Sequence, residues 1–380
     1  MKHRVVTKET RRGVPIVAGK NAPVWQKRIE TDAAQVLNSS TKAVKAILER
    51  RAELDRKGNH DIPLVVLAGE FHSIPSHTIH HVAVLNGLKN SGKKIAFGYE
   101  EEHNLLAQKF TKEMGRDPSL EEISALNKRD ITGTLSLKTN LGFCGYYGAD
   151  HTRAALFRFL LRHNIKSCFT DVSRPDSVLD ASDPSTVESL RACFKHAVSD
   201  IDVESPEGVR VRNHHMVAAS LDLARNSGAR IVMLSCGDTH VAGSMQLDFS
   251  ARHSLAAQFK HRGAAVMAMP IFTKYLSEDD IPPSRVLTSK ERLYISELPR
   301  MVAAYDPDSD KPVRGRPATL RNRVDEATYT NALLARCGLK KETLSVGEYK
   351  KQQAQFKNEM RGIFKECEKI VAKAPAIVLT

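Results

Sequence analysis

Five short apolar segments recur through the middle of the chain, and the stretches between them carry apolar residues at helical spacing. The segments are residues 64–69, 93–100, 165–170, 230–236 and 264–269. The first, LVVLAG, has the β-branched content and the terminating glycine that favour a buried strand. Strands that alternate with helices in this way predict an α/β fold with a mostly parallel sheet and helices on both faces.

The helical pattern gives a second set of elements. We expect helices within residues 24–57, 76–89, 102–128, 151–163, 184–198, 205–226, 251–261, 319–335 and 346–373. Residues 64–100 then form a strand, a helix and a strand, which predicts a βαβ unit with a right-handed crossover. Residues 133–150 are rich in glycine and aromatic residues, and we expect a long loop there, a candidate lid or binding loop.

The same pattern divides the chain into three parts. Residues 1–61 hold an N-terminal arm and helices, residues 62–270 an α/β catalytic core, and residues 271–380 a linker and a basic helical extension. Within the extension, residues 303–318 are polar and rich in proline, which is typical of a linker. The helices of the extension either pack on the core or form an appendage that binds a partner.

Composition restricts the class of protein. The chain has 380 residues, of which 41% are hydrophobic and 27% charged, and these are values of a globular protein. No apolar run is long enough to cross a membrane, and no signal peptide is recognisable. The six cysteines form no CxxC pair, which argues against a zinc ribbon and for a reducing compartment. We therefore expect a cytoplasmic protein, and translocation into another cell stays open.

The net charge of +13 raises the question of a polyanionic partner. Lysine and arginine are spread along the chain among acidic residues, and only 6% of residues are aromatic, which gives little material for base stacking. We do not expect nucleic acid as the main partner. An acidic protein surface or an anionic membrane remains open.

Three of the predicted strands end in ionisable side chains. These are Glu70 and His72 after the first strand, Glu100, Glu101 and Glu102 after the second, and Asp238 and His240 after the fourth. Because parallel strands place their carboxyl ends along one edge of a sheet, these groups can converge. Among the three glutamates we choose Glu100, which best continues the alternation of its strand. Asp171 follows a further strand, and we expect it to cap the strand end.

Four short motifs appear in order along the core. They are Gly69-Glu70-Phe71-His72, Glu100 after KIAFGY, Arg212-Asn213 on a helix, and Gly237-Asp238-Thr239-His240-Val241-x-Gly243. In residue type, order and context they resemble the TIKI/TraB and erythromycin-esterase/ChaN-like superfamily. The resemblance covers roughly residues 62–270. Phe71 departs from it, because the family often has a small or polar residue near that position.

The resemblance implies hydrolysis of an acyl bond, most of all a peptide bond. The TIKI branch is regarded as metal-dependent proteases, toxin branches cleave host proteins, and the erythromycin-esterase branch opens a lactone. ChaN-like members bind haem, so a haem-binding or small-ligand-binding protein and a small-molecule esterase are the alternatives. A further hypothesis is an interaction protein whose basic helical extension carries the function.

The chemistry of hydrolysis gives each site residue a role. We expect Glu70 and Glu100 to flank a water molecule, with one of them as general base. His72 and His240 then shuttle protons and contact the oxyanion, or they ligate a divalent metal (manganese, cobalt or zinc) if one binds. Arg212 either pins Glu100 or Asp238 or binds developing negative charge.

Other candidates have simpler explanations. His77 and His81 share a helix face at a spacing that can chelate a metal, but solvated or hydrogen-bonded histidines on a helix surface are the simpler interpretation. Cys236 has the position of a buried strand residue. Cys144 lies in the glycine-rich stretch and is a thiol candidate with no identifiable base beside it.

Overall fold

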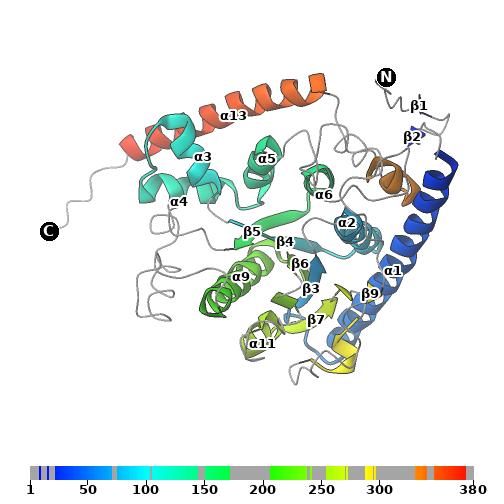
Figure 1. Cartoon of the computed structure of the whole chain (residues 1–380). Helices are drawn as coiled ribbons and strands as arrows, with labels where there is room; N and C mark the ends of the chain where they lie inside the picture. Colours follow the sequence, from blue (N-terminus) through cyan, green and yellow to red (C-terminus); the bar gives the residue numbers. More distant parts are fainter. Residues whose placement is uncertain are drawn as a thin grey trace.

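The computed structural model describes the chain in segments: residues 8–9, 15–16, 22–70, 75–102, 105–143, 150–171, 206–237, 240–241, 254–269, 271–272, 287–293, 295–296, 330–339 and 346–373. At the centre of these segments is a sheet of five parallel strands in the order β5-β4-β6-β3-β7 (Figure 1). Its strands are β3 (Leu64–Glu70), β4 (Ile95–Glu102), β5 (Lys166–Asp171), β6 (Ile231–Gly237) and β7 (Ala265–Met269). The predicted α/β fold is confirmed, and each predicted strand overlaps an observed one.

The remaining elements surround this sheet. The helices are α1 (Ala22–Arg56), α2 (Pro75–Asn90), α3 (Leu105–Met114), α4 (Leu120–Arg129), α5 (Thr134–Phe143), α6 (Asp150–Arg162), α9 (Pro206–Ser227), α11 (Leu255–His261), α13 (Val346–Lys373) and the short 3-10 helix η4 (Ser289–Glu291). Two small pairs are formed by β1 (Lys8–Glu9) with β2 (Pro15–Ile16) and by β8 (Ile271–Phe272) with β9 (Ile295–Ser296). None of the described helices combines the length and the apolar character needed to cross a membrane.

Both faces of the sheet are buried, and strand alternation decides which residue faces which layer. In β3, Leu64, Val66 and Ala68 join one hydrophobic cluster with α1, α2 and α6. Val65 and Leu67 point to the other face and join a cluster with α9 and α11. Each buried valine or leucine contributes about 1.5–3 kcal/mol, which explains why β3 and β7 are near-continuous apolar runs.

The order of the strands differs from a simple βαβ unit. β6 lies between β3 and β4, so that Ile231 is paired with Leu64 on one side and with Ile95 on the other. The connection through α2 therefore crosses over a strand that comes much later in the chain. The prediction of two consecutive strands joined by a helix is correct, but these strands are not neighbours.

The predicted loop at residues 133–150 is wrong over its first half, which forms the helix α5. Asp130, which precedes α5, caps the N-terminus of this helix. Its carboxylate accepts hydrogen bonds from the backbone N–H groups of Leu135 at 2.6 Å and Ser136 at 2.9 Å. Gly133 makes the turn with φ +70°, next to the backbone of Ser167. Residues 144–149, which include Cys144, lie outside the described part.

The helix expected over residues 102–128 is divided in two. Gly115 ends α3 with φ +72°, and Ser119 begins α4 with a capping box that it shares with Glu122. Both helices bury apolar residues against α13, whose bounds match the prediction. The helix expected at 184–198 lies outside the described residues, and that expected at 319–335 is described only from residue 330, where the chain is helical as far as residue 336.

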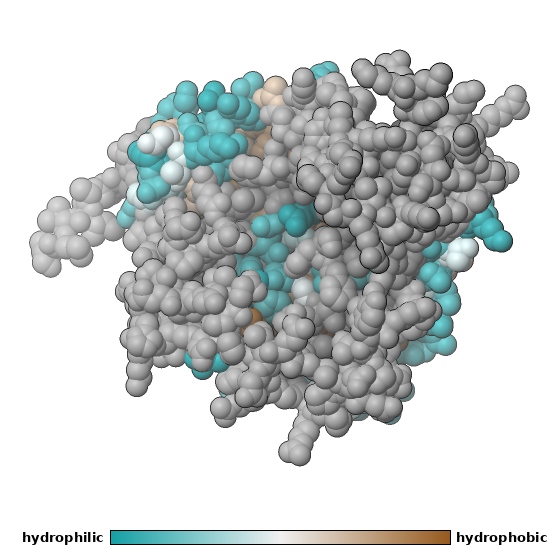
Figure 2. All heavy atoms as spheres, viewed as in Figure 1, coloured by the Kyte–Doolittle hydropathy of each residue, from teal (hydrophilic) through white to brown (hydrophobic). Residues whose placement is uncertain are grey.

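The last helix, α13, packs back on the core. Phe356, Met360 and Phe364 on α13 are buried against α3 and α4. Figure 2 shows mainly hydrophilic residues on the outer surface over α3 and α4. Leu37 and Ile131 are the large hydrophobic side chains that remain exposed among the described residues. The described outer surface is therefore mostly polar.

Candidate functional site

A cluster of charged side chains lies at the carboxyl edge of the sheet, where β4, β5 and β6 end. Its centre is Glu100, whose side chain is 6% exposed. A β-bulge between Tyr99 and Glu102 shifts the register of β4 against β5 at this point. Neighbouring Glu101 accepts a hydrogen bond from Arg153 of α6 instead. The structure thus places Glu100, and not Glu101, in the cluster that faces α9.

Arg212 of α9 lies between two carboxylates. Its Nη2 donates to Glu100 Oε1 at 2.5 Å and to Asp171 Oδ2 at 2.9 Å. Its Nε lies 3.1 Å from both carboxylate oxygens of Asp171. Asp171 ends β5, the strand beside β4, so the two acids reach the same guanidinium from adjacent strands. Such charge-assisted bonds fix both position and orientation of the guanidinium.

His240 completes the cluster after the end of β6. Its Nε2 lies 3.2 Å from Glu100 Oε1, and its Nδ1 lies 2.5 Å from Asn213 Oδ1. The backbone N–H of Gly237 donates to Glu100 Oε2 at 2.5 Å. Both ring nitrogens of His240 thus face oxygen atoms, and the ring is buried. Asn213 follows Arg212 on α9, which explains why these two residues act on the same edge.

The charge state of Glu100 follows from these contacts. Burial by itself would raise the pKa of Glu100. The hydrogen bond and charge of His240, the charge of Arg212 and the Gly237 N–H outweigh burial and lower the pKa to about 2. Glu100 is therefore ionised at neutral pH and is a poor acceptor for a proton from water.

Glu70 belongs to a second polar group, on the face of the sheet toward α2. Tyr99 donates its hydroxyl to Glu70 Oε1 at 3.3 Å, and Ser235 donates to Glu70 Oε2 at 2.9 Å. His81 Nδ1 lies 3.1 Å from the Ser235 hydroxyl and 3.6 Å from Glu70 Oε2. Burial lowers the pKa of His81, although the charge of Glu70 opposes this. All these side chains are buried.

The two groups meet at Gly237. In the register of β3 and β6, Glu70 is the partner of Gly237, whose N–H binds Glu100. Glu70 shares the strand phase of Leu64, Val66 and Ala68, which face α2, whereas Glu100 binds Arg212 on α9. The described partners of the two glutamates therefore come from opposite faces of the sheet.

The predicted site residues are distributed as follows. Glu100, Arg212 and His240 lie together, and Glu70 lies in the adjoining group. His72 is outside the described residues. Asp171 contacts Arg212 directly and is more than the strand cap expected from the sequence. Its position at the carboxyl end of a predicted strand is the signal that marks it as a candidate, and only the structure shows that this strand lies next to that of Glu100.

The histidines of α2 are not on a solvent-exposed surface. His77 and His81 are each 1% exposed, because α2 is enclosed by α1, α6 and the sheet. The interpretation of these residues as solvated histidines is wrong, whereas the alternative of a hydrogen-bonded histidine is correct for His81, which contacts the Ser235 hydroxyl. The described residues contain no group of three or more histidine, cysteine, aspartate or glutamate side chains arranged to hold a metal ion. A metal-ligand set is therefore not formed by these residues, and we assign no step to a metal.

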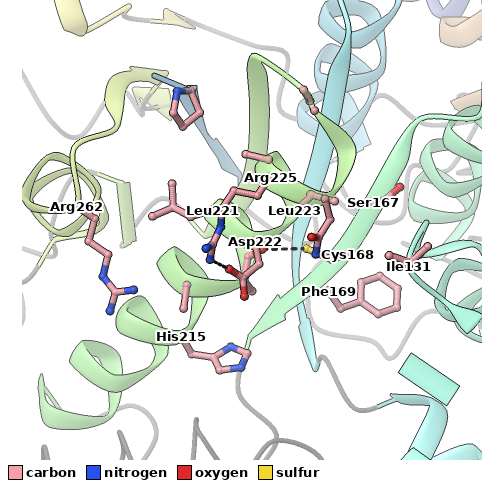
Figure 3. A pocket seen from close by; sticks show the side chains of 18 of the residues that line it. Ile131, Ser167, Cys168, Phe169, His215, Leu221, Asp222, Leu223, Arg225 and Arg262 are labelled. Atoms are coloured by element: carbon pink, nitrogen blue, oxygen red, sulfur yellow. Dashed lines mark hydrogen bonds and ion pairs between the residues drawn. The ribbon is translucent and has the colours of Figure 1, made fainter. Parts of the chain in front are cut away.

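A separate cavity of about 1080 Å³ lies along α9 on its side toward β5, α4 and α5 (Figure 3). Some of the polar side chains that line it are paired with each other or with a neighbour, as in the ion pair of Arg225 with Asp222 and the hydrogen bonds of Asp130 with the start of α5. Burial raises the pKa of Cys168 to about 12, which makes this thiol unreactive. Cys236, expected to be a buried strand residue, is fully buried in β6. The charged cluster at the strand ends, and not this cavity, is therefore the candidate site.

No protein-family model, curated protein or solved structure matches the chain.

Proposed function

We propose that the chain is a hydrolase of acyl bonds, and that peptide bonds are its main substrate class. The observation that supports this is the cluster of Glu100, Arg212 and His240 at the carboxyl edge of a parallel sheet. This edge is where α/β proteins bind their ligands. The cluster joins a proton-carrying ring, a guanidinium and an ionised carboxylate, the groups needed for proton transfer and charge stabilisation.

The geometry favours a division of labour within this proposal. The low pKa of Glu100 makes it a poor general base, so we assign the activation of water to Glu70. His240, aligned by Asn213 and Glu100, donates a proton to the leaving group. Arg212 binds Glu100 and Asp171 and so fixes the position of both carboxylates.

The test is a substrate screen followed by matched variants. The purified full-length chain is assayed against a mixed peptide library and a panel of esters and lactones, which separates a peptidase from an esterase. With the substrate found, His240→Gln and Glu70→Gln should each lower kcat by about a hundredfold or more, while far-UV circular dichroism stays unchanged. His261→Gln, at an exposed position on α11, is the control and should retain activity. Full activity in both site variants would refute the assignment.

A further inference from the structure

The surroundings of the Glu100 carboxylate have the form of an anion-binding site. Among the described residues, three groups direct donors at it: the Gly237 N–H at 2.5 Å, Arg212 Nη2 at 2.5 Å and, at 3.2 Å, His240 Nε2. They come from β6, from α9 and from the segment after β6. Backbone N–H groups combined with a guanidinium are the usual recognition elements for a carboxylate.

Each of these donors is held in place without Glu100. Arg212 is anchored by Asp171, which accepts from its Nε and Nη2. His240 is anchored through Nδ1 by Asn213 at 2.5 Å. Gly237 is fixed by its position at the end of β6, opposite the end of β3. The positions of the three donors are therefore set by contacts other than the carboxylate that they bind, and this is the property of a preorganised site.

We propose that the Gly237 N–H, Arg212 and His240 form a binding site for a carboxylate, and that the side chain of Glu100 is its built-in occupant. The ligand class is a small planar carboxylate, and an external one competes with a glutamate that is permanently close by. Wild-type protein therefore binds free carboxylates weakly, and removal of the Glu100 side chain opens the site.

The experiment measures thermal unfolding of the full-length chain with sodium formate, and with sodium chloride as the salt control. In Glu100→Ala, ~100 mM formate should raise Tm by about 5 °C over chloride, as expected for a ligand about a hundredfold above its Kd. Wild type should show no such difference. Asp171→Ala is the matched control, because it removes the other carboxylate on Arg212 while Glu100 stays in place, and it too should not respond. The double variant Glu100→Ala with Arg212→Met should lose the response.

The inference is overturned if formate and chloride act alike on Glu100→Ala, or if the double variant responds as strongly as the single one. Should Glu100→Ala not fold, Glu100→Ser is measured in the same way, and absence of a formate effect there also refutes the inference. A larger effect of sulfate than of formate would contradict a site for a planar carboxylate. Because the measurement needs no turnover, failure to find hydrolysis would count against the proposed function and leave this result intact.

Discussion

His80 gives a quantitative test of the packing between α1 and α2. Its side chain is fully buried, and neither ring nitrogen has a hydrogen-bond partner among the described residues. Burial, together with the charges of His81 and His77, lowers the pKa of His80 from 6.5 to about 3, with a weaker opposing effect of the Ser39 backbone. His80 is therefore neutral in the folded protein over most of the pH range.

The sign of the pH dependence follows from this. The unfolded chain binds a proton on His80 below about pH 6.5, while the folded chain does so only near pH 3. The contribution of neutral His80 to the free energy of unfolding is therefore fully present above pH 6.5, and it is lost as the pH falls toward 3. The loss amounts to about 2 kcal/mol at about pH 5. The Ser39 backbone lies near the ring but makes no hydrogen bond of normal geometry with it, so the buried ring nitrogens are poorly paired, which costs about 1–3 kcal/mol at any pH.

The perturbation is His80→Leu, which keeps an apolar side chain of similar size and cannot bind a proton. Its free energy of unfolding, from urea titrations followed by far-UV circular dichroism, should exceed the wild-type value by about 1 kcal/mol at about pH 7.5. The difference should grow by about 2 kcal/mol on going to about pH 5. His60→Gln, at an exposed position, is the control and should follow wild type. A difference between His80→Leu and wild type that does not change with pH would refute the reasoning.

Two further predictions concern contacts that stabilise the α/β fold away from the candidate site. Arg51 is 1% exposed and donates to two backbone carbonyls in the segment that follows α1. Arg51→Met should therefore reduce the free energy of unfolding, measured in urea titrations, by about 3 kcal/mol. Equal stability of this variant and wild type would contradict the role of Arg51. A Cβ on Gly133 would lie 1.8 Å from the carbonyl oxygen of Ser167. At Gly92, φ is also positive, but no atom lies within 4 Å of the position of a Cβ. Gly133→Ala should therefore lower Tm far more than Gly92→Ala. Similar Tm losses in the two glycine variants would show that strain in φ, and not the close contact, decides the cost.

The strands could be predicted from the sequence because burial on both faces leaves a simple mark, a short apolar run. In β3 this run is uninterrupted and ends at an acid, and in β6 only Ser235 interrupts it before the final glycine. The order of the strands could not be predicted, since the position of β6 between β3 and β4 depends on packing of whole layers. The helix α5 was missed for a different reason. Its start depends on Asp130, a cap that lies outside the glycine-rich stretch and whose role is visible only in three dimensions.

For the candidate site, the sequence indicated which edge of the sheet to consider but not which partners each side chain has. Alternation along β4 pointed to Glu100, and the structure places that residue beside Arg212 and His240. Alternation could not show that Asp171 binds the same guanidinium, because this depends on β5 being the neighbour of β4. Which side chains meet across two strands depends on the strand order, and the alternation within one strand does not reveal that order.

For the hydrolase that we propose, the separation of the two polar groups by the sheet would give the two glutamates different surroundings. When two carboxylates share one site, their repulsion raises the pKa of at least one of them, and the two pKa values then depend on each other and on every nearby charge. Here Glu100 is bound to Arg212 and held ionised, while Glu70 is surrounded by the hydroxyls of Tyr99 and Ser235 on the other face. Gly237, next to both, presents its N–H to one group and leaves the other to its own partners. A fixed negative charge and a base that accepts a proton need different surroundings, and two faces of one sheet edge can provide them.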